Sequence, residues 1–437
     1  MKRISNSVIA LSLFIGIANA NAQERKQLTL DEAVQLGIQN SKSLKIDAAK
    51  IEEATADLLA AKNRQLPELS ISGSYLYLPS KPNIDLKIPG VSSAGGPEVH
   101  QVAYGSANLS VPIYSGGRIK YGIQSAKYLV EASKLSTEND KVAIAYNVAQ
   151  AYNNLFKANQ SIKVLEENLS ASQKRDETFL KLENNGVIAR NDRLKANLQT
   201  SNIELQLLEA KNNYNIANIN MDLLLGLPEA TEIEVDQQYI DEADDVKPVD
   251  FYLNEARDNR KDLQALDQQR KAAELGTKSA KAENLPSIVF TSGYVAADIP
   301  KFLTIYNAVN VGVGVSYNLS NLWKENSSLK QSKAREMQLS ATNELLNDNI
   351  KLEVNREYQN SDYSKKRIAV FEKAAVQANE NYRITKNKYD NGLATMTELL
   401  DADAAQISAN VGVINAKADA ALAYRKLLQT TGILTSK

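Results

Sequence analysis

Apolar and polar residues alternate along residues 309–319, where every odd position is apolar and every even position is small or polar. This alternation is typical of a β-strand with two different faces. Its length fits the roughly 9–11 residues of a strand in a membrane β-barrel. Residues 103–113 alternate in the same way, and residues 69–77 and 288–294 supply two partner strands. The pattern therefore predicts four strands.

Between the strands, apolar or small residues recur every seven positions. One seam has two rows, Val148, Leu155, Ile162 and Leu169 with Ala151, Ala158, Leu165 and Ser172. The corresponding row in the second half of the chain is Val354, Ser361, Ile368 and Ala375. Another stripe consists of Ala145, Ala149, Tyr152 and Phe156. A single stripe indicates ordinary helix packing, whereas two stripes on long helices favour a bundle or tube with coiled-coil packing.

The segments that carry these seams are long and free of proline. All ten prolines lie outside 113–227 and 301–437, and these spans are rich in helix-forming residues. Thr29 and Glu32 form a capping box at the start of the first helix. A helix over 118–184 would be roughly 100 Å long at about 1.5 Å per residue, well beyond the mean helix of a globular domain.

The chain is a tandem duplication. Ala61 and Leu66-Pro67 return 219 residues later as Ala280 and Leu285-Pro286. Further on the offset becomes 206 and holds without a gap, for example from Tyr152 to Tyr358. The extra 13 residues of the first copy lie between Tyr75 and Ser110, and we interpret them as a loop tip because insertions collect in exposed loops. The remaining segments have the same length in both copies, as expected for long elements that pair with each other.

These patterns predict a mainly α fold with a small β part, in a duplicated helix–strand–strand–helix–turn–helix plan. The expected domains are a signal peptide over 1–22, a first repeat over 23–228, an acidic linker over 229–250 and a second repeat over 251–437. The first repeat is expected to contain strands near 69–78 and 102–114 and helices near 30–64, 118–184 and 190–225. The second is expected to contain strands near 287–296 and 308–320 and helices near 251–283, 324–390 and 396–431.

A soluble, half-buried sheet shows the same alternation. Two features favour a membrane sheet instead. Trp323 and Tyr114 stand where a strand meets a long helix, as aromatic residues at a membrane interface do, and no other core-forming segment is available to cover the sheet. Four strands leave two open edges, which lipid does not tolerate. A barrel built from them must be oligomeric, and because eight strands fill their own interior, a conducting pore indicates three or more subunits.

The composition of the chain argues against most other classes of function. Residues 1–22 have a basic start, a short apolar core and an Ala20-Asn21-Ala22 cleavage site, which together predict a secretory signal. The net charge of −1 offers no basic surface for nucleic acid. The chain has no cysteine and a single histidine, His100, so it lacks thiol chemistry and thiolate metal sites. It has no phosphate-binding glycine loop. We expect no catalytic residue, no metal and no cofactor.

Two motifs and the duplicated plan resemble the TolC-like outer-membrane efflux proteins. The motifs are Leu28-Thr-Leu-Asp-Glu-Ala-Val and Tyr389-Asp-Asn-Gly392-Leu-Ala-Thr-Met-Thr-Glu398-Leu-Leu-Asp401-Ala. The resemblance covers nearly all of the chain after the signal peptide. It implies a homotrimer with a 12-stranded barrel in the outer membrane and a long α-helical tunnel through the periplasm. It also implies a passive channel for efflux or type I secretion, docked to a periplasmic adaptor and an inner-membrane exporter.

The resemblance also implies a gate at the periplasmic end of the tunnel. The acidic positions six and nine residues after the second glycine are Glu398 and Asp401 here. Spaced by three, they share a helix face, and a trimer would place six carboxylates around one opening, with some pKa values raised by repulsion. Without the family, two acids near a turn fit a solvated face.

The family's closed gate pairs a tyrosine with an acid of the first repeat, here Tyr389 and Asp192. Its arginine position holds Ala394 in this chain, so Arg190 or Arg193 would have to substitute.

The turns at Gly186 and Gly392 are the breaks in the long helices, so they and the adjacent Val187 and Leu393 are the expected adaptor-docking tips. The linker over 229–250 contains nine acidic residues and one lysine. It fits either a belt around the helical barrel or a solvated connector.

Two other classes of function remain open. One is a secreted coiled-coil protein that spans the envelope as a structural link or an adaptor without a pore. Such a protein needs no lipid-facing strands, and adaptors carry one helical hairpin rather than two. The other is an enzyme, which fits poorly because a rod of helices offers no obvious concave pocket.

Overall fold

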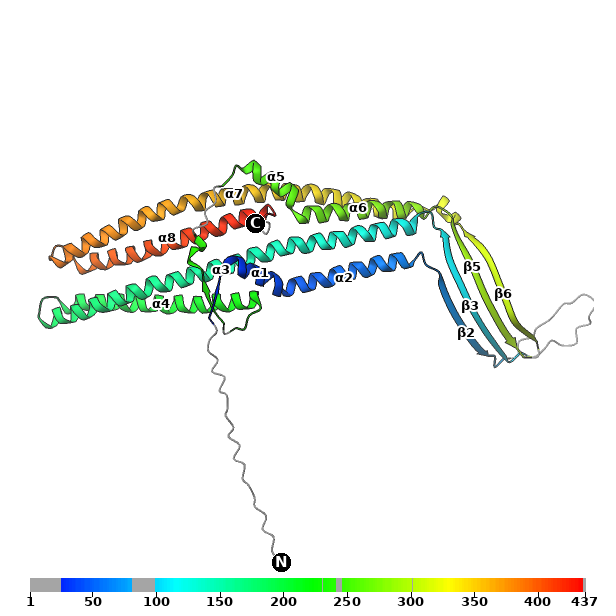
Figure 1. Ribbon diagram of the computed structural model, residues 1–437, viewed down its shortest axis with the longest axis horizontal. Coiled ribbons are helices and arrows are strands. Elements are labelled where there is room, and N and C mark those ends of the chain that lie inside the picture. The colour runs from blue at the N-terminus through cyan, green and yellow to red at the C-terminus, as the bar shows by residue number, and fades with distance from the viewer. Residues whose placement is uncertain (1–24, 81–98, 230, 241–245, 301, 435–437) are drawn as a thin grey trace, which may run out of the picture. The chain divides into compact units, whose positions relative to one another are not determined.

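The computed structural model describes residues 25–80, 99–229, 231–240, 246–300 and 302–434. The expected signal peptide over 1–22 lies outside these residues. The fold is mainly helical with a small β part (Figure 1). The helices are α1 (Leu30–Asn40), α2 (Lys42–Asn63), α3 (Arg118–Asn184), α4 (Arg190–Leu225), α5 (Val249–Asn259), α6 (Lys261–Ala282), α7 (Ser327–Asp390) and α8 (Met396–Thr430), with 3₁₀ helices η1 (Gln237–Ile240) and η2 (Leu319–Leu322). The strands are β1 (Arg25–Leu28), β2 (Glu68–Tyr77), β3 (Gln101–Tyr114), β4 (Glu232–Val235), β5 (Ser287–Ile299) and β6 (Leu303–Ser316).

The chain divides into two compact units. Unit 1 contains residues 1–40, 147–244 and 363–422, and unit 2 contains residues 41–146, 245–362 and 423–437. No helix among the described residues is both long and apolar enough to span a membrane.

Unit 2 contains a four-stranded antiparallel sheet in the order β2–β3–β5–β6. The register sorts the side chains onto two faces. One row across the sheet consists of Ile71, Ala107, Tyr294 and Val309, and the next row on the opposite face consists of Ser70, Asn108, Gly293 and Asn310. On the apolar face of β6, Val309, Val311, Val313 and Val315 are all exposed. On the polar face, the Ser72 and Ser106 hydroxyls lie 2.9 Å apart in a hydrogen bond.

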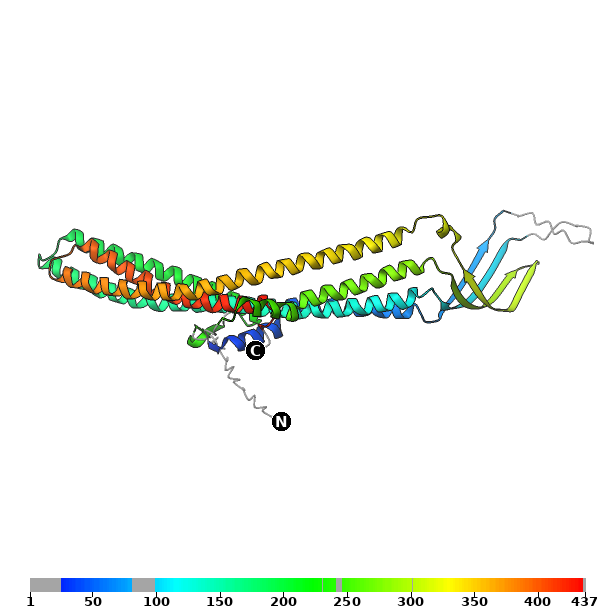
Figure 2. The same ribbon diagram turned by 90° about the horizontal axis from the view of Figure 1, so that it is seen from above.

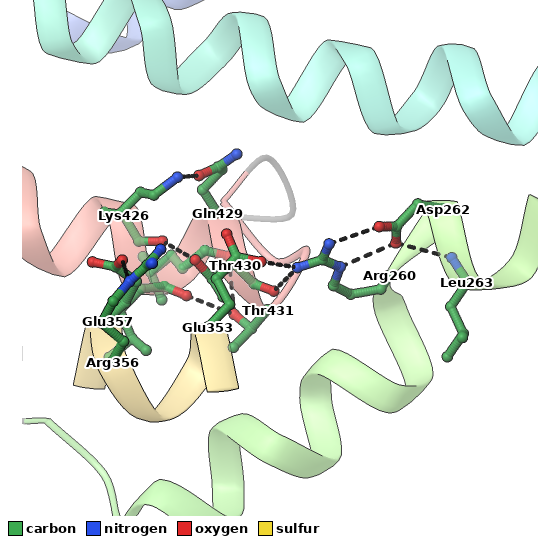
Figure 3. A network of polar contacts seen from close by, with 12 residues as sticks. Arg260, Asp262, Leu263, Glu353, Arg356, Glu357, Lys426, Gln429, Thr430 and Thr431 are labelled. Atoms are coloured by element: carbon green, nitrogen blue, oxygen red, sulfur yellow. Dashed lines mark hydrogen bonds and ion pairs between the residues drawn. The ribbon is translucent and has the colours of Figure 1, made fainter. Parts of the chain in front are cut away.

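In unit 2, α5 and parts of α7 and α8 pack around an apolar cluster. It consists of Tyr252, Ala256, Ile350, Val354, Leu427 and Leu428. Beside it, the Arg260 guanidinium joins three segments (Figure 3). It contacts Asp262 Oδ2 at 2.6 Å, Glu353 Oε2 at 2.8 Å and the Thr430 carbonyl oxygen at 3.1 Å. Burial opposes its charge, but these carboxylates outweigh that effect and raise the pKa of Arg260.

Unit 1 contains the ends of the two helical hairpins α3–α4 and α7–α8 that carry the turns, and within it these ends lie side by side with their turns at the same end in both views (Figures 1 and 2). Its interior holds the cluster of Leu165, Ile203, Leu207, Ala210 and Ile407. The strands β1 and β4 pair in parallel. The fully buried Tyr152 hydroxyl fastens them to α3, since it donates to the Leu28 carbonyl at 2.9 Å and accepts from the Asp236 N–H at 2.7 Å.

Several expected boundaries were wrong. The helix expected over 30–64 is divided at Asn40 into α1 and α2, and the one expected over 251–283 is divided at Arg260 into α5 and α6. At each break a polar side chain donates a hydrogen bond to a carbonyl at the end of another helix. The strand expected over 308–320 starts at Leu303 and ends at Ser316.

The acidic linker is not simply a solvated connector. It contains β4 and η1, and its residues Ile233 and Tyr239 are buried. Its apolar positions therefore contribute to the core of unit 1, while the charges between them stay at the surface.

Candidate functional site at the helical tips

The turns that close the two hairpins share one backbone design. Gly186 follows α3 with φ of 70°, and Gly392 follows α7 with φ of 72°. In each turn the next N–H reaches back to the last helical turn, from Val187 to the Leu182 carbonyl at 2.9 Å and from Leu393 to the Lys388 carbonyl at 2.8 Å. This is the Schellman arrangement, in which a glycine adopts the left-handed conformation and satisfies helix carbonyls.

Both turns present an apolar side chain to solvent. Val187 is 67% exposed and Leu393 is 77% exposed, and a Cβ added at Gly186 or Gly392 would meet nothing within 4 Å. An exposed aliphatic residue at the end of each hairpin can contribute apolar surface to a contact with another protein.

The second turn is held by a capping box that the sequence analysis missed. Glu398 Oε2 accepts from the Thr395 N–H at 2.6 Å and from the Thr395 hydroxyl at 2.9 Å, and the Glu398 N–H donates back to that hydroxyl at 3.3 Å. In the single protomer these hydrogen bonds lower the pKa of Glu398. The signal was present, because Thr395-x-x-Glu398 repeats the pattern of Thr29-x-x-Glu32.

Asp401 shares the exposed face of α8 with Glu398. A polar, solvent-accessible carboxylate face near the turn is therefore present on the protomer.

The first turn uses ion pairs instead. Arg193 on α4 contacts the Glu183 carboxylate on α3, and Asp192 pairs with Lys195 at 3.4 Å. Arg190 is exposed. Arg193 is thus engaged within its own hairpin rather than free to replace the family's gate arginine.

Tyr389 packs against an apolar cluster near the turns, rather than forming a hydrogen bond with Asp192; the cluster consists of Phe179, Ala196, Met396 and Leu399. The Tyr389 ring meets Phe179 edge-on with centroids 5.8 Å apart. Burial, followed by the charges of Asp192 and Asp390, raises the pKa of Tyr389. The structure therefore brings Tyr389 and Asp192 near each other, although among the described residues the recorded partner of Asp192 is Lys195.

A buried ion pair links the two hairpins, and sequence reasoning missed it. The Arg175 guanidinium on α3 contacts Asp403 of α8 at 2.7 and 3.3 Å and donates to the Tyr382 hydroxyl of α7 at 3.1 Å. Burial acts to lower the pKa of Arg175, but the bonds and charge of Asp403 outweigh it and raise the pKa. Arg175 lies three residues after the seam position Ser172 and so on the same side of α3, but a helical repeat does not show which residues of distant helices meet.

The proposed membrane-interface aromatics are both accessible. Trp323 directly follows η2 and is 71% exposed, and Tyr114 is the last residue of β3 and is also exposed. Side chains in these positions can contact the polar boundary of a bilayer.

The expectation that the helices form no concave pocket was wrong. A cavity of about 610 Å³ lies in unit 1 and is lined by residues of α3, α4, α7 and α8, including Leu165, Gln206, Phe371 and Ile407. Its lining carries one ionisable residue, Glu209, and general acid–base catalysis usually needs a positioned pair. Among the described residues, no group of three or more His, Cys, Asp or Glu is placed to hold a metal ion.

A family model for the outer membrane efflux protein matches residues 33–227 and 252–433. The chain belongs to the outer membrane efflux protein family. The two matched segments correspond to the two sequence repeats, and the gap between them falls in the acidic linker. A search of the curated proteins gives no match.

Solved outer-membrane proteins share the fold of this outer membrane efflux protein. The outer membrane protein VceC of Vibrio cholerae is 18% identical with a TM-score of 0.76, over 92% of this chain and 96% of VceC. The CmeC outer membrane channel of Campylobacter jejuni is 18% identical with a TM-score of 0.75, over 93% and 86% of the two chains. The open state of the MtrE outer membrane channel of Neisseria gonorrhoeae is 17% identical with a TM-score of 0.73, over 93% and 89%.

Proposed function

We propose that three copies of this chain form a passive export channel, with a 12-stranded barrel in the outer membrane and a helical tunnel in the periplasm. Substrates would arrive from an inner-membrane exporter through a periplasmic adaptor. The channel has no catalysis of its own. Membership of the outer membrane efflux protein family supports the location.

The observation that carries the proposal is the sheet of unit 2. Among the described residues its two edge strands, β2 and β6, each pair on one side only, and one face is lined by exposed aliphatic side chains. In lipid each unsatisfied backbone group costs several kcal/mol, so the edges must pair with other copies. Three copies supply enough strands for a barrel that is wider than the self-filled eight-stranded type.

Fractionation tests this assembly. The protein should be found in outer membranes, without residues 1–22, and should migrate as a trimer that heat dissociates. A soluble monomer as the main cellular species would contradict the proposal.

The tips are the proposed adaptor contact. The chain has no cysteine, so Val187→Cys and Leu393→Cys each introduce a unique crosslinking site on an exposed turn. Both should crosslink to the co-expressed adaptor. Crosslinks obtained only from cysteines in the 79–100 loop would show that the topology is inverted.

The gate needs a milder substitution than alanine. Because Glu398 closes a capping box, Glu398→Ala would remove hydrogen bonds at the start of α8 as well as a charge. Glutamine keeps the capping interaction. The double variant Glu398→Gln/Asp401→Asn therefore removes the carboxylate charges that we propose line the narrowest opening, while the turn stays intact.

Planar-bilayer recordings then test the site. Multivalent cations should block current through the native channel, and the double variant should lose this block and show weaker cation preference. Heat-dissociation temperatures should match, which shows that assembly is unchanged. Equal cation block in both proteins would place these carboxylates outside the conducting path.

A further inference from the structure

Two aspartates face each other where α2 packs against α3 in unit 2. Asp47 on α2 is only 4% exposed, and its Oδ1 atom pairs with Lys50 Nζ at 2.9 Å. Its Oδ2 atom is buried and has no hydrogen-bond donor. Asp140 on α3 is half-buried and lies within hydrogen-bonding reach of Asp47. A buried carboxylate oxygen without a donor is costly.

The second repeat provides a natural comparison. The position equivalent to Asp47 is Leu266, 219 residues later, and the position equivalent to Asp140 is Leu346, 206 residues later. Leu266 is buried, and Leu346 packs against the apolar cluster around Tyr252. The fold therefore accepts leucine at these positions, so the carboxyl pair is particular to the first repeat rather than required by the architecture.

A shared proton resolves the orphaned oxygen. Two ionised carboxylates have no donor to offer each other, but a protonated carboxyl donates one hydrogen bond to its neighbour. A bridging metal ion is a poorer fit, because the ammonium of Lys50 already occupies one side of Asp47, and no third ligand of the acidic or histidine type is placed nearby among the described residues.

We propose that Asp47 and Asp140 form a proton-binding site, in which the Asp140 carboxyl carries the proton and donates it to Asp47 Oδ2. The charged groups that act on Asp140 are Asp47 and Lys50, both on α2. Its neighbours on α3 are Asn139 and the exposed Glu138–Lys141 ion pair, whose atoms are 2.6 Å apart.

The electrostatics agree with this placement of the proton. Burial raises the pKa of Asp140, and the charge of Asp47 and its hydrogen bond raise it further, against the opposing effects of the Lys50 charge and of a hydrogen bond from the Asn139 side chain. A carboxyl whose folded pKa is raised contributes full stability below its unfolded pKa. That contribution is lost as pH rises through the folded pKa. The contact between α2 and α3 should therefore be firmer in acid than at neutral pH.

Hydrogen exchange of the full-length protein in detergent, corrected for intrinsic rates, tests the site. The reporters are peptides from α2 (Lys42–Asn63), with peptides from α6 (Lys261–Ala282) as the equivalent internal control. Three variants accompany the native chain: Asp140→Asn, Asp140→Ala and Asp47→Leu/Asp140→Leu. The asparagine amide of the first variant can donate a hydrogen bond to Asp47 at every pH, whereas the alanine of the second variant has no donor at any pH. The double variant carries the leucine pair of the second repeat.

In the native chain, protection of α2 should fall several-fold from about pH 4, near the ordinary aspartate pKa of about 3.9, to pH 8, while protection of α6 changes little. Asp140→Asn and the double leucine variant should show no such fall, and Asp140→Ala should be poorly protected at both pH values. An equal fall in the native chain and Asp140→Asn would overturn the proposal. Restoration of protection in the native chain at pH 8 by calcium would also overturn it, because the pair would then be a cation site. Neither result depends on conduction.

Discussion

The junction between α1 and α2 and the junction between α5 and α6 occupy equivalent positions in the two repeats, yet different chemistry holds them. At the first, Asn40 Nδ2 donates to the Leu225 carbonyl at the end of α4, at 2.7 Å. At the second, Arg260 donates to the Thr430 carbonyl at the end of α8, at 3.1 Å, and also holds two carboxylates (Figure 3). The last carbonyls of a helix lack partners within it, so any donor at this place suffices.

The turns at the tips also share a backbone plan but are held by different side chains. Thr395 and Glu398 cap α8 with side chains, whereas the equivalent positions of the first repeat are Ala189 and Asp192, and Ala189 offers α4 no side-chain cap. The ion pair of Arg193 with Glu183 closes that turn instead. Duplication has kept the backbone plan, including the left-handed glycines, while the side chains that satisfy it have diverged.

The largest loss of stability is expected from breaking a contact that only one repeat position has. Asp403, which binds Arg175, corresponds to Asn197 in the first repeat, where the amide only reaches the exposed side of Asp176 at 3.2 Å. Arg175→Met should lower the free energy of unfolding by about 3 kcal/mol, because it leaves a buried carboxylate without its partner. Chemical denaturation of the detergent-solubilised protein measures this loss.

The matched control for that substitution is Asn197→Ala, which should change stability by less than about 0.5 kcal/mol. Adding Asp403→Leu to Arg175→Met should recover part of the loss, since the unpaired charge is then gone. If the proposed channel closes at its tips, Arg175→Met should also raise resting conductance, because it releases α3 from α8. A loss of stability no larger than that of Asn197→Ala would show that the ion pair contributes little.

The second largest expected loss of stability differs between the two helix junctions. Arg260→Met leaves Asp262 and Glu353 without their cation in a mostly buried place, at a cost of about 2–3 kcal/mol. Asn40→Ala removes one neutral hydrogen bond, worth about 1 kcal/mol. Heat-dissociation temperatures of the two variants should therefore differ clearly. Equal shifts would mean that the junctions depend on the carbonyl contact alone and that the extra charges of the second repeat are neutral.

The third expected loss of stability compares two left-handed glycines, one crowded by neighbouring backbone and one not. Gly432 has φ of 78°, and a Cβ there would lie 3.1 Å from the Asn259 carbonyl. Gly392 has φ of 72°, but its added Cβ would meet nothing. Gly392→Ala should cost about 1–2 kcal/mol from the backbone conformation alone. Gly432→Ala should cost more, because rigid backbone must move as well. The difference between the two unfolding free energies measures the crowding.

The long-range periodicity was the best guide to the fold. Proline-free spans and heptad seams located α3 and α4 with ends that coincide with the structure, because long helices are stabilised by features repeated many times along the chain. Alternation located the strands, although the start of β6 lies five residues before the expected one. The breaks at Asn40 and Arg260 were not predicted, since each involves a hydrogen bond to a segment about 170–185 residues away in sequence.

The candidate site was harder to predict. The tip glycines follow from local turn chemistry, and the exposure of Val187 and Leu393 follows from the same turns. The partners of Arg175, Arg193 and Asp140 are set by how separate helices meet, and one sequence does not encode that in any local pattern. The family resemblance supplied positions for a gate but not the capping role of Glu398.

The smallest expected effect would make the two turns alike. Ala189→Thr places a hydroxyl at the start of α4, where Thr395 stands in the second repeat. That hydroxyl can accept from the Asp192 N–H, which now reaches only the Ala189 carbonyl at 3.0 Å. The gain should be about 0.5–1 kcal/mol, the usual worth of a side-chain cap relative to alanine. Hydrogen exchange of the first turn of α4 measures it, with Ala189→Val as a control of similar shape that cannot accept. Equal protection in the threonine and valine variants would show that the ion pair of Arg193 already holds the turn fully closed.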